Sequence, residues 1–224
     1  MKNNWNMIRT GLEKLDEILG GGIRNCTILD IFGASSTGKT QLALQIVVNS
    51  LQGGGKIFYQ DTTGAFRPER LLDLIKSKGL DPNLLNYVTV GRITNTSEQF
   101  MNITKITESN FSLIIIDNVT DLFSYEYSKE DQIREKTAQF AKYMARLAKV
   151  VADKKIPIIL VNMVRKYGEN EQENLEPIIS LFTHIRIKLS KNSLYEGQVM
   201  TPMKRAQFKF RITKEGLVDV SEAI

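Results

Sequence analysis

A phosphate-binding loop constrains this chain more than any other stretch of its sequence. Residues 33–40 read Gly-Ala-Ser-Ser-Thr-Gly-Lys-Thr, which is the spacing G-x-x-x-x-G-K-T. The apolar run 27–32 precedes the loop as a predicted buried strand, and an apolar helical pattern over 42–50 follows it. The two glycines allow the backbone to curl so that successive N–H groups, and the positive end of the following helix, face a polyphosphate. The sequence therefore predicts a nucleotide site.

Individual residues of this loop have distinct expected roles. We expect Lys39 to neutralise the β- and γ-phosphates of ATP and the Thr40 hydroxyl to hold Mg²⁺. A second signature follows at Asp117, the acid that ends the apolar run 113–116. A strand buried on both faces places such a carboxylate at its C-terminal edge, where it can hold a Mg²⁺-bound water. The predicted nucleotide-binding residues are Gly33, Ala34, Ser35, Ser36, Thr37, Gly38, Lys39, Thr40, Gln41 and Asp117, with Thr40 and Asp117 as the magnesium ligands.

The composition fits an ordinary globular protein. The 224 residues suit one α/β domain, and no apolar run approaches the roughly 20 residues that span a bilayer. The N-terminus lacks the apolar core of a signal peptide, and the single cysteine, Cys26, lies in the first strand pattern and excludes an intrachain disulfide. We therefore expect a cytoplasmic protein with no membrane partner. The net charge of +5 fits a nucleic-acid partner and equally fits a mildly basic surface.

Alternating strand and helix patterns predict an α/β fold with a mostly parallel twisted sheet flanked by helices. Further strands are predicted at 56–61, 87–90, 113–117, 156–161, 184–189 and 197–203, with an edge strand and turn at 208–217. The late strands are expected to form an antiparallel extension. Helices are predicted after Thr10 as N-cap, from Pro68, after Ser97 as N-cap, and over 129–154. The predicted core face of the last helix consists of Ile133, Thr137, Phe140, Met144, Leu147 and Val151.

Two stretches of the sequence resemble the RecA/RadA superfamily of ATPases. Residues 10–23 follow the pattern T-G-x-x-x-L-D-x-x-L-G-G-G-I, which precedes the phosphate loop in that superfamily. Residues 61–70, Asp-Thr-Thr-Gly-Ala-Phe-Arg-Pro-Glu-Arg, are similar to the D-T-E-G-T-F-R-P-E-R signature of archaeal RadA and eukaryotic strand-exchange recombinases, which the KaiC-like branch lacks. The resemblance extends from Thr10 to about Val220. It implies a RecA-like P-loop core that binds ATP and Mg²⁺, with Arg70 packed against the adenine.

The chain departs from this family pattern at two functional positions. Thr63 stands where the family has the glutamate that orients the attacking water, and removing such a base costs on the order of 10² to 10⁴ in rate. We expect ATP binding with slow or negligible hydrolysis, the alternative being that Asp61 or Glu69 substitutes for the glutamate. Met163 stands where a family glutamine senses the γ-phosphate and relays it to a DNA-binding loop, and a thioether cannot donate that hydrogen bond.

The segments that bind DNA in the family carry little net positive charge here. The second DNA-binding loop, expected at 165–176, combines Arg165 and Lys166 with Glu169, Glu171, Glu173 and Glu176, and the first, near 124–135, is mixed in charge. Two basic groups remain. Lys142, Arg146 and Lys149 form a stripe on the helix over 129–154, which is typical of a solvated face. Lys188, Lys191, Lys204, Arg205, Lys209 and Arg211 gather on the late strands, either as a patch for nucleic acid or as cations that guard a sheet edge.

The plan of the chain resembles that of core-only archaeal RadA paralogues, the RadB-like proteins. We expect residues 1–224 to form a single RecA-like core domain with 1–22 as a lead-in helix, without the N-terminal helical DNA-binding domain and the F-x-x-A docking segment of the recombinases. The leading interpretation is an ATP-binding accessory of a RadA-type recombinase, or of another recombination protein, that binds this partner or single-stranded DNA during recombination and repair. The alternatives are a DNA-stimulated ATPase with weak strand exchange and a KaiC-like signalling ATPase without a DNA role. The oligomeric state is left open.

Overall fold

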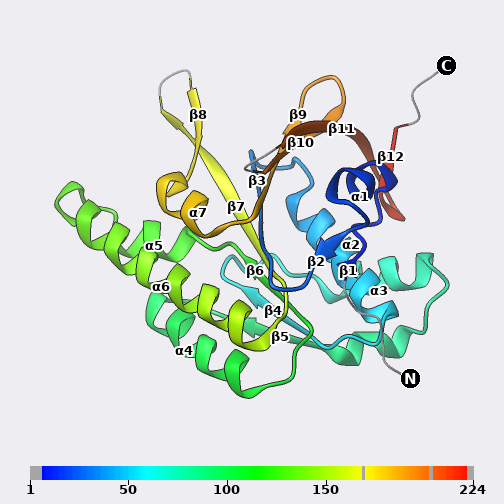
Figure 1. The fold of residues 1–224 in the computed structure, drawn as a ribbon, viewed down its shortest axis with the longest axis horizontal. Coiled ribbons are helices and arrows are strands. Elements are labelled where there is room, and N and C mark those ends of the chain that lie inside the picture. The colour runs from blue at the N-terminus through cyan, green and yellow to red at the C-terminus, as the bar shows by residue number, and fades with distance from the viewer. Residues whose placement is uncertain (1–6, 168–169, 202–203, 221–224) are drawn as a thin grey trace.

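The computed structural model describes residues 7–167, 170–201 and 204–220 (Figure 1). Its strands are β1 (Met7–Ile8), β2 (Ile23–Arg24), β3 (Ile28–Gly33), β4 (Ile57–Asp61), β5 (Val88–Arg92), β6 (Leu113–Asp117), β7 (Ile158–Tyr167), β8 (Asn170–Glu173), β9 (Ile185–Lys191), β10 (Tyr195–Thr201), β11 (Lys204–Thr213) and β12 (Gly216–Asp219). Its helices are α1 (Glu13–Leu19), α2 (Lys39–Gln52), α3 (Pro68–Ser77), α4 (Thr96–Glu108), α5 (Asp121–Glu126), α6 (Ile133–Lys154) and α7 (Glu176–Phe182), with 3₁₀ turns at η1 (Pro82–Tyr87) and η2 (Glu130–Gln132).

One large sheet organises these elements. Its strand order is β12-β11-β10-β9-β3-β7-β6-β4-β5, and β8 pairs with the far end of β7. The six strands from β9 to β5 run parallel to one another, whereas β10, β11 and β12 continue the sheet in antiparallel fashion. The predicted parallel α/β sheet with a C-terminal antiparallel extension is therefore confirmed. β1 and β2 form a separate two-stranded ribbon.

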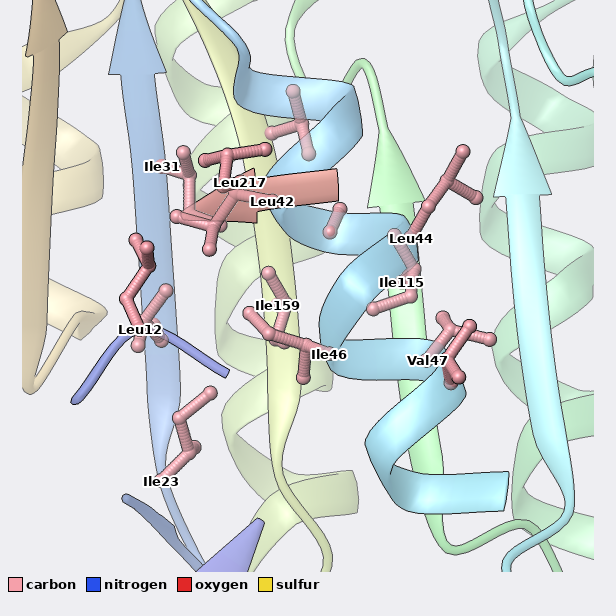
Figure 2. Packing of buried hydrophobic residues seen from close by; sticks show 14 of the residues in the cluster. Leu12, Ile23, Ile31, Leu42, Leu44, Ile46, Val47, Ile115, Ile159 and Leu217 are labelled. Atoms are coloured by element: carbon pink, nitrogen blue, oxygen red, sulfur yellow. The ribbon is translucent and has the colours of Figure 1, made fainter. Parts of the chain in front are cut away.

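Two apolar clusters cover the two faces of the parallel strands. On one face, α2 packs on the sheet, with α1 and α3 beside it. Figure 2 shows Leu42 and Ile46 of α2 beside Ile31 of β3 and Ile159 of β7. On the other face, α4, α5, α6 and α7 pack around buried rings such as Phe123 and Tyr143. The phosphate loop joins β3 to α2, so the central strand and a buried helix hold both of its ends.

The buried apolar face of α6 spans fewer residues than the apolar spacing in the sequence predicts. Phe140, Met144, Leu147 and Val151 are buried as predicted. Ile133 is 52% exposed, because it lies in the first turn of the helix, beyond the part that packs on the sheet. The helical stretch predicted from residue 129 also begins with the separate turn η2. The core face therefore starts later along the helix than the spacing of apolar residues suggests.

Some local predictions are wrong at element boundaries. Thr10 is not an N-cap: α1 begins at Glu13, and the backbone N–H and hydroxyl of Thr10 both donate to the Asp16 carboxylate, at 2.7 and 2.8 Å. Cys26 was predicted to lie in the first strand, but it precedes β3, is exposed and has a φ of 58°. The edge strand of the sheet is β12, whereas β11 is paired on both sides. Each of these features depends on contacts beyond the local sequence.

The region expected as a loop at 165–176 is a β-hairpin followed by a helix. β7 continues past the sheet to Tyr167 and β8 returns antiparallel to it, with Val164 opposite Glu173 and Arg165 opposite Gln172. α7 then begins at Glu176. β8 supplies hydrogen-bond partners for backbone groups of β7 that extend beyond the parallel sheet. Glu169 and the side chains of Lys166 and Lys204 lie outside the described part of the structure.

The N-terminus of α4 is capped by Asn95, not by the predicted Ser97. The Asn95 side-chain oxygen accepts a 2.8 Å hydrogen bond from the N–H of Glu98, and the Glu98 carboxylate accepts one of 2.8 Å from the N–H of Thr94. Ser97 lies inside the first turn and is exposed. The reciprocal bonds satisfy backbone donors that the helix leaves without partners.

This cap leads to a stability prediction with a matched control. Replacing Asn95 by alanine should lower the free energy of unfolding by about 1 kcal/mol, because the N–H of Glu98 loses its partner. Replacing Ser97 by alanine should change it by less than about 0.5 kcal/mol, as at an ordinary surface position. Urea unfolding followed by circular dichroism measures both. An equal or larger loss for Ser97→Ala would contradict the assignment of the cap.

Candidate nucleotide-binding site

The phosphate loop runs from the end of β3 to the start of α2, and its two glycines are required by different features. A Cβ atom on Gly33 would lie 2.1 Å from the carbonyl oxygen of Leu189 on β9, so only glycine fits this close backbone approach. Gly38 is the N-cap of α2 and has a φ of 98°, a left-handed conformation that favours glycine. The loop residues 33–41 predicted from the sequence therefore form one turn at the helix N-terminus.

Lys39 lies across the loop. Its amino group donates a 2.6 Å hydrogen bond to the carbonyl oxygen of Ala34, which also accepts a 2.9 Å bond from the Thr37 hydroxyl. Burial lowers the pKa of Lys39, and the negative charge of Asp117 partly opposes this shift. An anion at this loop would favour the charged form of the amino group, as a polyphosphate does.

Asp117 lies at the C-terminal end of β6, next to the first turn of α2. One of its carboxylate oxygens, Oδ2, accepts 2.8 Å hydrogen bonds from the hydroxyls of Thr40 and Tyr59. Burial raises the pKa of Asp117, while these two hydrogen bonds lower it. The structure thus brings together the two predicted magnesium ligands. A hydroxyl and a carboxylate in contact provide the oxygen ligands that Mg²⁺ prefers.

Tyr59 is a residue of this site that the sequence analysis missed. It lies on β4, is almost completely buried and stacks against Phe66 with ring centroids 4.7 Å apart. Burial and the Asp117 charge raise the pKa of its hydroxyl well above the usual value, so the hydroxyl stays a hydrogen-bond donor. A tyrosine within a buried apolar strand carries no local signal for this contact, because the acid lies on β6, which is adjacent only in the folded sheet.

The structure gives Asp61 a structural role. Its Oδ1 accepts hydrogen bonds from the backbone N–H groups of Thr63, Gly64 and Ala65, at 3.0, 2.7 and 3.3 Å, and from the Thr63 hydroxyl at 3.2 Å. Its Oδ2 accepts the N–H of Phe66 at 3.2 Å. Both oxygens therefore hold the turn that carries Thr63, which speaks against Asp61 as a substitute for the missing glutamate. Glu69, the other candidate, is exposed in the first turn of α3.

Arg70 lies next to the phosphate loop and ties three elements together. Its Nε and one terminal nitrogen donate to the side-chain oxygen of Gln41, at 2.9 and 2.7 Å. The guanidinium also donates to the carbonyl oxygens of Thr213 and Lys214 in the β11–β12 turn, at 3.2 and 2.6 Å. Arg70 and Gln41, which were each predicted to bind the nucleotide, are thus in direct contact. The packing of Arg70 against adenine stays a prediction.

Met163 lies beside the loop, where the family's sensing glutamine would stand. It occupies the position on β7 that pairs with Gly33 on β3. Its neighbour Asn162 is completely buried and belongs to a polar network: the Thr120 hydroxyl donates to its side-chain oxygen at 2.6 Å, and its amide donates to Glu173 of β8 at 2.7 Å. This network joins the segment after Asp117 to the hairpin through side chains other than Met163.

A buried ion cluster fixes the base of the hairpin. Arg186 on β9 is hydrogen-bonded to Glu173 and donates to Glu176 at 3.0 Å, and it lies 3.8 Å from the carboxylate of Asp30 on β3. Burial and the neighbouring Glu173 raise the pKa of Asp30 well above its usual value, although Arg186 opposes this shift. Glu173 and Glu176, two of the four acids that give residues 165–176 a net negative charge, are therefore paired with Arg186. The interpretation of 165–176 as an acidic loop overlooked this pairing.

The described residues match neither the pattern of a membrane-spanning helix nor that of a metal-binding cluster. Within residues 7–167, 170–201 and 204–220, no helix is long and apolar enough to cross a bilayer. Over the same ranges, no three His, Cys, Asp or Glu side chains gather into a metal-binding group. A cation at the phosphate loop would therefore depend on Thr40, Asp117, water and phosphate oxygens, as is usual for Mg²⁺ beside a nucleotide.

Comparison with known proteins identifies the family. The Rad51 family model matches residues 2–191. The DNA repair and recombination protein RadB of Thermococcus onnurineus is 33% identical over 231 residues, covering 96% of this chain and 98% of that protein. RadB of Pyrococcus horikoshii is 33% identical over 226 residues, covering 95% of this chain and 94% of that protein. The meiotic recombination protein DMC1 homolog B of Oryza sativa subsp. japonica is 33% identical over 168 residues, 70% of this chain and 49% of the plant protein.

These matches include the stretches from which the resemblance was inferred. The family model spans the phosphate loop, residues 61–70 and Asp117, and the RadB proteins align over nearly the whole chain. The chain therefore belongs to the Rad51 family of the RecA/RadA superfamily and is RadB-like.

Proposed function

We propose that this protein binds ATP with Mg²⁺ and acts as an accessory protein in homologous recombination and DNA repair, with weak or absent ATP hydrolysis. The observation that carries the proposal is a complete phosphate site without its catalytic carboxylate. Lys39, Thr40 and Asp117 are brought together, whereas Thr63 stands at the glutamate position. RadB relatives, described as DNA repair and recombination proteins, support the biological role.

In this proposal different residues of the chain bind the phosphates, the magnesium ion and the base. The loop N–H groups and Lys39 bind the phosphates, while Thr40 and Asp117 hold the magnesium and its water. Tyr59 keeps the Asp117 carboxylate oriented through its 2.8 Å hydrogen bond. Arg70 borders the base through its link to Gln41. Thr63 has no basicity near neutral pH, so it would not accept a proton from a water beside the γ-phosphate.

The proposed partner is a RadA-type recombinase or another recombination protein, with single-stranded DNA as a second partner. A recombinase partner and a DNA partner are both expected, because the relatives of this chain are described as recombination proteins. The Asn118–Thr120–Asn162 network connects the segment after Asp117 to the hairpin through buried, hydrogen-bonded side chains.

Nucleotide titration and turnover assays together test this function. The unmodified protein should bind ATP·Mg²⁺ in calorimetry and release phosphate near the background rate, with or without single-stranded DNA. The Lys39→Ala variant should lose at least about tenfold in ATP affinity, since a charge-assisted phosphate contact contributes more than about 1.4 kcal/mol. Circular dichroism confirms that this variant folds. Rapid turnover stimulated by DNA in the unmodified protein would refute the accessory role.

A further inference from the structure

The antiparallel extension of the sheet has one uncovered face. Strands β9, β10 and β11 contribute Ile187, Leu189, Val199, Phe208 and Phe210 to the apolar cluster under α1 and α2. None of their residues belongs to the cluster under α4–α7 on the opposite side. Figure 1 shows the helices of that second cluster lying over β6 and β7, away from β10 and β11. On this second side, Arg186 near the start of β9 is covered by Glu173 of β8 and Glu176 of α7. Farther along β9, and on β10 and β11, the described helices leave the face open.

Basic side chains gather on this open face. Because side chains alternate along a strand, the residues between the buried ones point to the open side. On β9 this position holds Lys188, and on β11 it holds Arg205, Lys209 and Arg211. Lys188 pairs across the sheet with Gln198, and Gln198 pairs with Gln207. We define these four cations and the glutamines between them as the basic face.

The basic face is not explained by protection of a sheet edge. Edge strands carry lysines that discourage pairing with other chains. The edge strand here is β12, and its residues Gly-Leu-Val-Asp include no lysine or arginine. The cations lie on β9 and β11, both of which are paired on two sides. Of the two interpretations of this basic group, protection of a sheet edge is therefore excluded, and the nucleic-acid patch remains.

The charges of the basic face form no close ion pair within the described residues, although Glu196 of β10 lies directly across from Lys209. Among the described residues, no carboxylate lies within 4.0 Å of the charged groups of Lys188, Arg205, Lys209 or Arg211. The basic stripe of α6 differs, because Lys149 pairs with Asp153 at 2.9 Å and Arg146 stacks on Phe100 at 5.2 Å. A groove of about 360 Å³ on the basic face is lined by Lys188 and Lys209 and by the acids Glu171 and Glu196. The charges of the groove therefore balance, and the positive charge of the face comes from Arg205 and Arg211, which lie outside the groove lining.

We propose that the basic face binds the phosphate backbone of single-stranded DNA. Lys209 and Arg211 are two residues apart on one strand, about 7 Å along the chain. That distance is close to the spacing of neighbouring phosphates in an extended single strand, so successive cations on β11 match successive phosphates. The glutamines add hydrogen-bond donors for phosphate or base edges. The inference deepens the proposed recombination role, on which it rests, by placing the DNA on β9, β10 and β11, with Glu171 of the hairpin at the border of the site.

A charge-matched pair of variants tests the proposal. The first, Lys188→Gln/Lys209→Gln/Arg211→Gln, neutralises the basic face, and the control, Lys142→Gln/Arg146→Gln/Lys149→Gln, removes the same charges from α6. Fluorescence anisotropy with labelled oligothymidylate measures affinity between 50 and 200 mM salt. The slope of log affinity against log salt should become shallower by about 2 in the first variant, since each phosphate contact contributes about 0.7. The control should keep the slope of the unmodified protein.

The outcomes separate this inference from the function on which it rests. Both variants should bind ATP like the unmodified protein, because none of the substituted residues contacts the phosphate loop. Equal DNA affinity in the first variant and the unmodified protein would overturn the basic face alone. A loss of DNA binding in the α6 control, or tighter binding of a duplex of the same length, would also overturn it. No DNA binding at 50 mM salt would refute the DNA partner and leave the ATP site standing.

Discussion

A Thr63→Glu variant is expected to hydrolyse ATP about 10²- to 10⁴-fold faster than the unmodified protein, the range that a positioned general base contributes. Thr63 is exposed in the turn after β4, and Asp61 fixes this turn through backbone hydrogen bonds that do not depend on the residue at position 63. A longer acidic side chain can therefore extend toward the γ-phosphate without rebuilding the turn. Phosphate release under single-turnover conditions measures the change.

The matched control for this prediction is Thr63→Gln. Glutamine has the length of glutamate and can hold a water by hydrogen bonds, but it cannot accept the proton. Its rate should stay near that of the unmodified protein. Equal rates for the two variants would mean that water positioning, not basicity, limits the reaction. A glutamate variant that binds ATP but stays slow would show that a second element, such as Met163, also limits hydrolysis.

Removing Arg186 is expected to produce the largest loss of stability. An Arg186→Met variant should lose about 3–5 kcal/mol in free energy of unfolding, the usual cost of leaving a buried ion pair with one partner. Arg186 is the cation that contacts Glu173, Glu176 and Asp30, and its guanidinium also lies 5.1 Å from the centre of the Phe32 ring. Without it, Glu173 keeps the hydrogen bond from the Asn162 amide but loses its cationic partner. Urea unfolding followed by circular dichroism gives the difference.

Two further variants make this result interpretable. Lys188→Met removes a cation from the same strand, two residues away and on the open face, and should change stability by less than about 0.5 kcal/mol. Adding Glu173→Gln to Arg186→Met should recover part of the loss, because the uncompensated buried charge is then gone. A loss below about 1 kcal/mol in Arg186→Met would mean that water solvates the acids and that the cluster does not anchor the hairpin.

The sequence alone predicted the features that depend on local patterns. The phosphate loop follows from its glycine spacing, and Asp117 follows from the apolar run that precedes it. The parallel sheet follows from strand and helix periodicities, because each apolar stretch must be buried wherever it packs. The start of α3 at Pro68 was also predicted, since proline fixes the backbone angle of a first helical turn.

Only the tertiary structure decided which polar groups meet. Tyr59 of β4 contacts Asp117 from another strand. Glu173 looks like one more loop acid in the sequence, yet it is buried against Arg186, which lies on β9. The basic residues near the C-terminus became a face because β9, β10 and β11 pair side by side in the sheet. Hydrophobic periodicity is local and can be read along the chain, whereas hydrogen bonds and ion pairs join residues that only the folded sheet brings together.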